Sequence, residues 1–325
     1  MSKLRFGVIG VGSLGFHHAR ILRELPDVEL VGIHDADPDR ARWVCDELAV
    51  RSFAALDELL SSVEAAVIAV PTTVHAVVAL SALRRGVHLL IEKPIAATLE
   101  EADQIVHEAD ANGVLVATGH VERFNAALRA CEPYLDEPRF VESHRLAPFG
   151  VRGTDVAVVL DLMIHDIDLV LSLIRRPVRS VAAVGVPVLT GSVDIANARL
   201  TFEGGAVANI TASRISPERM RKVRLFQRSG YLSLDLARGG GEFFRLRAGA
   251  RAAAAEGHPS IGALAERVEL TGDGAEPLRA ELNSFADAVR GKGPLVVTGD
   301  DGRRALAVAL EIMCCIDTAG DLSAS

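Results

Sequence analysis

The chain has 325 residues, of which 49% are hydrophobic and 24% are charged, and its formal net charge is −8 at pH 7. This length accommodates two domains with separate cores, and the composition is that of an ordinary globular protein. The negative charge argues against a nucleic-acid partner, because phosphate backbones are held by basic patches.

The cysteines and the chain's first residues bear on its compartment. None of Cys45, Cys131, Cys314 and Cys315 forms a C-x-x-C pair, so we expect reduced thiols rather than disulfides or a structural zinc. The histidines form no cluster with carboxylates, and we expect no metal. Because the sequence shows neither a signal-peptide pattern nor an apolar run near 18 residues, we expect a cytoplasmic protein without a membrane partner.

The first 120 residues alternate apolar runs with amphipathic stretches. The expected strands are 4–11, 28–35, 65–70, 87–91 and 114–118, and the expected helices are 13–24, 38–47, 74–85 and 99–111. Uninterrupted apolar runs are typical of parallel strands that are covered on both faces. The alternation predicts a Rossmann domain over residues 1–120, which is a doubly wound parallel sheet of the α/β class.

Residues 121–325 follow a different pattern. Helices are expected at 126–134 and 155–174, and strands at 139–146, 178–188, 193–202, 206–214, 223–228 and 231–235. Short turns between consecutive strands, such as Glu203-Gly204-Gly205, predict a largely antiparallel open sheet in a C-terminal α+β domain for substrate binding and oligomerisation. Since one sheet face needs cover, we expect a homodimer or homotetramer.

Two further segments complete the expected organisation. Residues 238–258 are rich in Gly, Ala and Arg without a clear period, and we interpret them as a mobile insertion. Helices at 278–290 and 300–318 close the chain and can pack back on the first domain.

A glycine-rich segment follows the first expected strand and opens a helix; it reads Gly10-Val11-Gly12-Ser13-Leu14-Gly15. Such a loop lets the backbone approach a pyrophosphate, which the helix N-terminus then holds. Asp35 ends the second strand, where a carboxylate accepts hydrogen bonds from ribose hydroxyls and repels a 2′-phosphate. NAD is therefore favoured over NADP, although the nearby Arg40 weakens this preference.

The Glu92-Lys93-Pro94 turn lies at the carboxyl end of the strand that finishes at Ile91. This is the edge where open α/β sheets bind ligands, and the proline restricts the backbone of Lys93. Beside a positively charged nicotinamide, the ammonium form of a lysine is disfavoured, so that Lys93 could exchange protons. Taken alone, the tripeptide favours a surface lysine in a turn.

A second group of polar residues lies within the expected helix at 155–174. Asp161, His165 and Asp168 are spaced i, i+4 and i+7, which places them on one face of an α-helix. Such residues need partners or a ligand when they are buried. A histidine–aspartate hydrogen bond that only stabilises the helix is the alternative.

The segment from Gly119 to Asn125 links the two expected domains and should border the cleft. His120, Arg123 and Asn125 are candidate substrate-binding residues, because arginine suits phosphate or carboxylate and asparagine suits a hydroxyl. A structural arginine at a helix start explains the segment equally well.

Together these motifs resemble the Gfo/Idh/MocA oxidoreductases over nearly the whole chain. The resemblance also includes His18-Ala19 and the segment Val70-Pro71-Thr72-Thr73-Val74-His75. It implies hydride transfer between NAD(P) and a hydroxyl-bearing carbon of a sugar or cyclitol. It also implies that Lys93, Asp161 and His165 are catalytic, and that the cofactor is lined by Pro71, Thr72, His75, Glu92 and Lys93 in addition to the glycine-rich loop.

In the implied mechanism, His165 takes the proton of a substrate hydroxyl while hydride passes to the nicotinamide, and Lys93 hydrogen-bonds the same oxygen. Asp161 orients the imidazole or shares its proton. The sequence does not decide which of Lys93 and His165 is the base.

Three functions stay open at this point. The stretch from Gly119 to Asn125 resembles a subgroup that oxidises nucleotide-activated amino sugars such as UDP-N-acetylglucosamine. That subgroup usually has proline where Ala126 stands, and many relatives have a small residue at the position of Met163. The alternatives are a dehydrogenase of inositol, another polyol or a simple sugar, and a non-catalytic NAD-binding regulator, which would not need the three catalytic residues.

Overall fold

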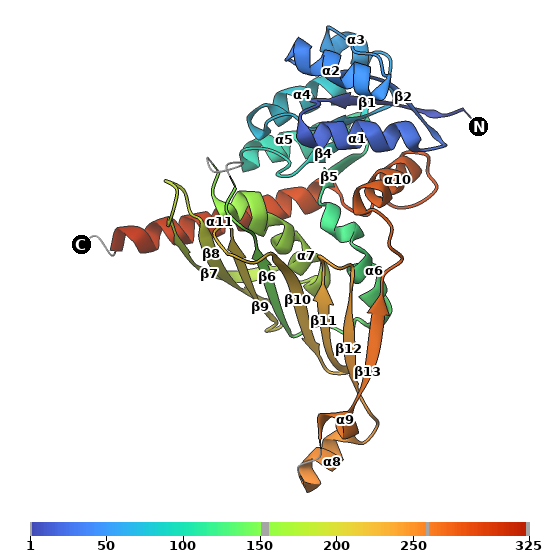
Figure 1. Cartoon of the computed structure of the whole chain (residues 1–325). Helices are drawn as coiled ribbons and strands as arrows, with labels where there is room; N and C mark the ends of the chain where they lie inside the picture. The colour runs from blue at the N-terminus through green and yellow to red at the C-terminus, as the bar shows by residue number, and fades with distance from the viewer. Residues whose placement is uncertain (1, 151–155, 258–259, 323–325) are drawn as a thin grey trace. The chain divides into compact units, whose positions relative to one another are not determined.

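The computed structural model describes residues 2–150, 156–257 and 260–322 (Figure 1). Its contacts divide the chain into two compact units. The N-terminal unit comprises residues 1–121 and 276–306, and the C-terminal unit comprises residues 122–275 and 307–325. The second division falls within α11 (Gly299–Leu322), so this helix contributes residues to both units.

The N-terminal unit is built on a five-stranded parallel sheet in the order β2-β1-β3-β4-β5. Its strands are β1 (Leu4–Ile9), β2 (Val28–His34), β3 (Ala65–Ile68), β4 (His88–Glu92) and β5 (Val116–Gly119). All four residues of β3 are buried, as expected for a strand covered on both faces. The prediction of a doubly wound parallel sheet is confirmed.

The helices of this unit differ in how they begin, and two of them have a side-chain cap. They are α1 (Ser13–Glu24), α2 (Pro38–Leu48), α3 (Leu56–Leu60), η1 (Thr72–Val74), α4 (His75–Leu83), α5 (Leu99–Asn112) and α10 (Pro277–Val289). Asp37 caps α2 through two backbone N–H groups, and Thr98 with Glu101 forms a capping box at α5. The short α3 was not expected, because five residues are too few to show a helical period.

The core of the N-terminal unit joins residues that are far apart in the chain. Phe6 of β1 is fully buried and meets Phe285 of α10 edge to face, with ring centroids 5.9 Å apart. Helix α10 also packs on α1. The packing of α10 against β1 and α1 therefore helps to position the loop between these two elements, which carries the glycine-rich segment.

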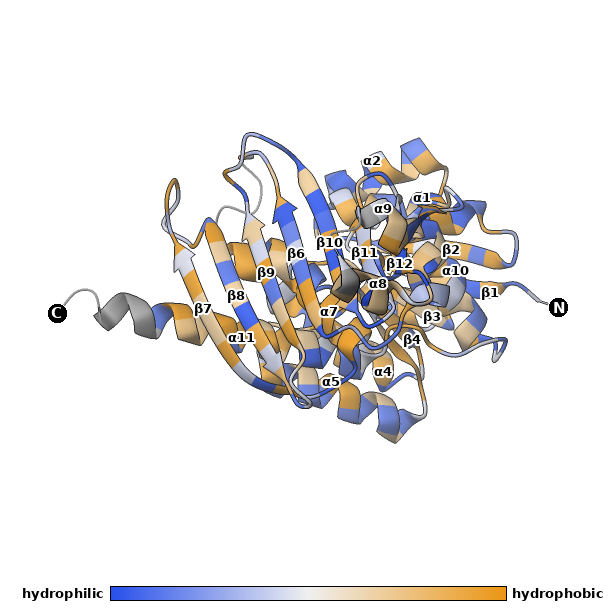
Figure 2. Cartoon of the chain, turned by 90° about the horizontal axis from the view of Figure 1, so that it is seen from below, coloured by the Kyte–Doolittle hydropathy of each residue, from blue (hydrophilic) through white to orange (hydrophobic). Residues whose placement is uncertain are grey.

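The C-terminal unit contains an eight-stranded sheet in the order β13-β12-β11-β10-β6-β9-β8-β7 (Figure 2). Its strands are β6 (Phe140–Leu146), β7 (Val178–Val186), β8 (Ile195–Phe202), β9 (Val207–Ser213), β10 (Met220–Gln227), β11 (Gly230–Asp235), β12 (Gly240–Leu246) and β13 (Ala265–Thr271). Every neighbouring pair is antiparallel except β6 with β9. Gly204 and Gly205 have positive φ in the turn between β8 and β9, which confirms this hairpin.

The C-terminal unit also contains helices, some of which pack on its sheet. They are η2 (Val121–Phe124), α6 (Ala126–Cys131), η3 (Glu132–Tyr134), the π-helical η4 (Val159–Met163), α7 (Ile164–Ile174), α8 (Ala250–Glu256) and α9 (Ile261–Leu264). Helix α7 packs on β6 and β9, and α6 packs on β11, β12 and β13. The expected helix at 155–174 thus consists of a π-helical turn followed directly by an α-helix, and residue 155 lies outside the described residues.

The interpretation of residues 238–258 as a mobile insertion is wrong. The described part of this segment forms β12 and α8, and β12 lies between β11 and β13 in the sheet. A Cβ at Gly241 would collide with the carbonyl oxygen of Ser233 on β11, so this position requires glycine. Because glycine has no side chain, the sequence shows no alternation of polar and apolar residues there. Phe243 supplies the strand's buried side chain.

Candidate active site

The glycine-rich loop has the geometry that a dinucleotide-binding turn requires. Gly10 has a φ of +81°, and a Cβ on Gly15 would collide with the carbonyl oxygen of Gly10. In contrast, a Cβ on Gly12 would meet no described atom within 4 Å. Gly12, Ser13 and Leu14 are exposed at the start of α1, where no described side chain caps the helix. The loop therefore leaves room for a pyrophosphate at the helix N-terminus.

Asp35 organises this loop from the end of β2. Its Oδ2 atom accepts the N–H of Val11 at 2.7 Å, and its Oδ1 atom accepts the N–H of Asp37 at 2.9 Å. Each carboxylate oxygen has two lone pairs, so that both retain capacity for ribose hydroxyls. Asp35 thus fits the predicted ribose-binding role.

Arg40 reaches the loop from α2, a contact that the sequence did not reveal. Its Nε atom donates to the carbonyl oxygen of Val11 at 2.7 Å, and Nη2 donates to that of Gly12 at 3.1 Å. The guanidinium also lies 4.4 Å from the ring centroid of Trp43. Arg40 therefore holds the glycine-rich loop through hydrogen bonds from its Nε and Nη2 atoms.

The segment after β3 contains Pro71, Thr72 and His75, which were predicted to line the cofactor. Pro71 precedes η1, Thr72 is its first residue, and both are partly or fully exposed. The buried ring of His75 lies with Nδ1 3.0 Å from the carbonyl oxygen of Pro94 and Nε2 2.9 Å from that of Val70. Burial lowers the pKa of His75, against the raising effect of these carbonyls. His75 therefore joins this segment to the turn after β4.

That turn holds Glu92 and Lys93, and the Lys93–Pro94 peptide bond is cis. Oε1 of Glu92 lies 2.7 Å from Nε2 of His18 on α1, and Oε2 accepts the backbone N–H of Lys93 at 3.3 Å. Burial alone would raise the pKa of Glu92, but His18 and Lys93 bring it below its usual value. Glu92 is therefore a charged carboxylate beside Lys93.

His18 belongs to the His18-Ala19 motif, to which the sequence assigns no role. It lies on the buried stripe of α1, together with Gly15, Ala19 and Leu22. A histidine at an apolar position of an amphipathic helix is a signal that could have identified it.

In the C-terminal unit, Asp161 and His165 are half-buried. Asp161 lies in the π-helical turn, whereas His165 lies in the first turn of α7. A π-helical turn is wider than an α-helical one, so the expected i, i+4, i+7 alignment does not hold strictly for Asp161. Such turns occur frequently at functional sites. The catalytic roles of both residues stay predictions.

The segment before α6 makes several contacts within the protein. The guanidinium of Arg123 donates to both oxygens of Asp168, with each distance 2.7 Å. The amide of Asn125 donates to Oε2 of Glu122 at 3.0 Å and to the carbonyl of Leu236 at 2.9 Å, while its oxygen caps α6. His120, at the end of the N-terminal unit, is buried. Substrate binding by these three residues stays a prediction.

A buried charge network in the C-terminal unit was not foreseen. Arg145 of β6 donates to Glu122 at 2.8 Å and to Asp166 of α7, which also accepts the hydroxyl of Ser143 at 2.5 Å. Burial by itself would lower the pKa of Arg145, but these two carboxylates raise it above its usual value. The network fixes α7 to β6 immediately beside His165.

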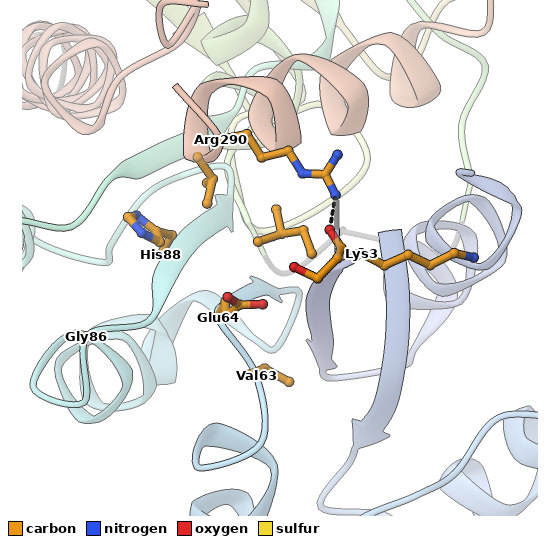
Figure 3. A pocket seen from close by; sticks show the side chains of 9 residues that line it. Lys3, Val63, Glu64, Gly86, His88 and Arg290 are labelled. Carbon is orange, nitrogen blue, oxygen red and sulfur yellow. Dashed lines mark hydrogen bonds between the residues drawn. The ribbon is translucent and has the colours of Figure 1, made fainter. Parts of the chain in front are cut away.

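A cavity of about 370 Å³ lies at the opposite edge of the N-terminal sheet (Figure 3). It is lined by residues at the amino ends of β1, β3 and β4 and by Val289 and Arg290. Dinucleotides bind at the carboxyl ends of such strands, and none of the predicted site residues lines the cavity.

Two kinds of feature are absent from the described residues. None of their helices is both long and apolar enough to span a bilayer. No group of three or more His, Cys, Asp and Glu residues among them is arranged to hold a metal ion.

Two family models match this chain, one in its N-terminal part and one in its C-terminal part. Residues 4–120 match the family model GFO_IDH_MocA, described as oxidoreductase family, NAD-binding Rossmann fold, and residues 117–233 match the model of a GFO/IDH/MocA C-terminal domain. UDP-N-acetylglucosamine 3-dehydrogenase of Acidithiobacillus ferrooxidans is 38% identical over 318 residues, covering 98% of both chains. A solved structure of that enzyme matches with a TM-score of 0.89 and 35% identity, covering 98% of this chain and 99% of the other. The scyllo-inositol 2-dehydrogenase (NAD(+)) of Bacillus subtilis is 27% identical over 66% of this chain and 68% of its own.

Proposed function

The chain belongs to the Gfo/Idh/MocA family of NAD-binding oxidoreductases, and we propose that it oxidises the 3-hydroxyl of UDP-N-acetylglucosamine with NAD. The observation that carries this proposal is the likeness to the Acidithiobacillus ferrooxidans enzyme, which extends over 98% of both sequences. Family membership confirms the predictions of an oxidoreductase and of NAD binding. Inositol dehydrogenases are more distant relatives, and they provide the alternative substrates for the assay.

Bound NAD would supply the hydride acceptor. Asp35 would hold the ribose, and the N–H groups at the start of α1 would hold the pyrophosphate, for which the open space at Gly12 leaves room. In the reaction we assign to this chain, His165 takes the proton from the substrate hydroxyl and Lys93 hydrogen-bonds that oxygen. Asp161 orients the imidazole of His165.

A substrate panel tests the proposal. Purified protein with NAD should form reduced nicotinamide with UDP-N-acetylglucosamine, and much more slowly with UDP-glucose, free N-acetylglucosamine or scyllo-inositol. Preferred turnover of the inositol would replace the proposed substrate. Tight NAD binding without turnover of any compound would instead favour the regulator.

We further propose that the sheet of the C-terminal unit forms a homodimer or homotetramer interface. A row of stacked rings crosses four neighbouring strands at Phe140, Phe226, Tyr231 and Phe244, with successive centroids 5.5, 5.4 and 4.8 Å apart. These rings are partly exposed, whereas their neighbours Val141, Leu225, Leu232 and Phe243 on the other face are buried. Aromatic side chains are enriched in protein interfaces.

Light scattering tests this interface. The wild-type protein should elute as a dimer or tetramer, and Tyr231→Arg should shift it towards the monomer, because the new charge cannot be buried without a partner. A wild-type monomer would exclude the interface. The cytoplasmic location stays a prediction from the sequence.

A further inference from the structure

A buried histidine connects the helix of the glycine-rich loop to the turn that carries Lys93. His18 of α1 is fully buried, and its Nε2 atom lies 2.7 Å from Oε1 of Glu92, whose side chain is 12% exposed. The two residues are separated by 74 positions in the sequence. This contact therefore ties α1 directly to the end of β4.

The direction of this hydrogen bond follows from its chemistry. An ionised carboxylate only accepts, so Nε2 of His18 carries the hydrogen and donates it. Nδ1 of His18 has no hydrogen-bond partner among the described residues. A hydrogen on that buried nitrogen would have no acceptor among them, whereas a hydrogen on Nε2 has the Glu92 carboxylate. His18 is thus a fixed donor to Glu92.

Glu92 in turn faces Lys93. Its second oxygen accepts the backbone N–H of Lys93 at 3.3 Å, and the two side-chain charges attract each other. Gly119 at the end of β5 provides the room, because a Cβ there would lie 3.1 Å from Oε2 of Glu92. The carboxylate is held from α1 and from the turn, and Gly119 of β5 leaves space for it.

We propose that His18 is a positioning residue, which holds the Glu92 carboxylate so that its negative charge stays beside the Lys93 ammonium. The inference rests on the proposed function in one respect, since it concerns the surroundings of the lysine that we assign to hydrogen-bond the substrate oxygen. The nearby carboxylate offsets the positive charge of an oxidised nicotinamide, which would otherwise disfavour that cation.

The reactivity of Lys93 provides a test that does not require turnover. The chain has only four lysines, Lys3, Lys93, Lys222 and Lys292, so mass spectrometry can follow the acetylation of each by acetic anhydride. Only the unprotonated amine reacts, and a neighbouring carboxylate suppresses that form. The other three lysines serve as internal references in the same sample.

Replacement of His18 by Leu removes the hydrogen-bond donor to Glu92, whereas the side-chain amide of Gln can donate in its place. In the folded His18→Leu protein, Lys93 should be acetylated about fivefold faster than in the wild type, because the Glu92 charge is no longer held near it. His18→Gln should restore most of the wild-type rate. The matched control is His17→Leu on the exposed side of the same helix, which should leave the rate unchanged.

Glu92→Gln removes the charge without altering α1, and it should accelerate the acetylation of Lys93 equally. The double variant should show no further increase, since His18 acts through Glu92. Unchanged acetylation in a folded His18→Leu protein overturns the inference; if that variant does not fold, unchanged acetylation in Glu92→Gln overturns it. A purely structural role would lower stability without changing the reactivity of Lys93.

Turnover separates this inference from the proposed function. If UDP-N-acetylglucosamine is oxidised, His18→Leu should reduce kcat about tenfold while the Kd for NAD changes far less. Faster acetylation without any sugar oxidation would support the role of His18 and contradict the proposed substrate. Normal kcat and normal acetylation in the variant would leave the enzyme assignment standing and reject the role of His18.

Discussion

Arg123 and Asp168 form a two-pronged ion pair within the C-terminal unit, in which Nε and Nη2 of the arginine donate to separate carboxylate oxygens. Asp168 is 1% exposed and Arg123 is 14% exposed. Removing one member of a buried pair leaves the other charge uncompensated. Arg123→Met should therefore lower the free energy of unfolding by about 3–5 kcal/mol in urea denaturation.

The double variant Arg123→Met, Asp168→Asn separates folding from substrate binding. It should recover much of the lost stability, because no charge is left buried. A raised KM for UDP-N-acetylglucosamine in this protein would support substrate binding by Arg123, and an unchanged KM would limit Arg123 to a structural role. Wild-type stability in Arg123→Met would contradict the ion-pair argument.

Two glycines of the loop should respond differently to alanine. A Cβ at position 15 collides with the backbone of Gly10, so Gly15→Ala should destabilise the N-terminal unit. A Cβ at position 12 meets no described atom, but it points into space that the pyrophosphate would need. Gly12→Ala should therefore retain its melting temperature and lose NAD affinity. Equal effects on both properties in both variants would contradict this distinction.

Asp35 should determine the preference between NAD and NADP. Asp35→Ser replaces the charged acceptor for the ribose by a neutral hydroxyl and removes the charge that repels a 2′-phosphate. We expect the Kd for NAD to rise at least about tenfold, as for the loss of a hydrogen bond to a charged group, and the Kd for NADP to fall. Trp43, the chain's only tryptophan, stacks on Arg40 near the loop and can report binding by fluorescence. An unchanged ratio of the two constants would contradict this role.

His88 should make stability depend on pH. Its Nδ1 atom accepts the N–H of Leu115 at 2.9 Å, and burial lowers its pKa below the usual 6.5. The unfolded chain therefore binds a proton below about pH 6.5 while the folded protein resists it. The stabilisation is complete above that pH and is lost as the pH falls towards the folded pKa.

Urea denaturation of the wild type and of His88→Gln tests this dependence. The wild type should lose more stability than the variant between neutral and mildly acidic pH, because glutamine does not titrate. The buried His75 contributes in the same direction in both proteins, so some loss should remain. Identical losses would exclude His88 as a contributor.

The sequence predicted the elements whose signals are local. Helix α1 has the expected bounds, because it begins at the glycine-rich loop and keeps an amphipathic period to Glu24. Strand β12 was missed, because Gly240 and Gly241 lack side chains that would show alternation. Its pairing with β11 and β13 depends on backbone approach rather than on a hydrophobic pattern.

The same limit applies to the candidate site. The spacing of the glycines and the position of Asp35 identify a dinucleotide-binding loop, because these positions along the chain determine which residues contact the cofactor. The partners of Arg123 and His18 lie 45 and 74 positions away in the sequence. The residue types indicate that a buried arginine and a buried histidine need hydrogen-bond partners, but they do not identify those partners. Only the folded chain reveals that Asp168 and Glu92 are those partners.

The most direct test of the account is the formation of reduced nicotinamide from NAD and UDP-N-acetylglucosamine by the wild type and by Lys93→Met, with NAD binding measured on the same samples. We predict that the variant binds NAD and produces no detectable reduced nicotinamide, while the wild type turns over. Turnover by the variant at the wild-type rate would contradict the assignment of Lys93 as a catalytic residue.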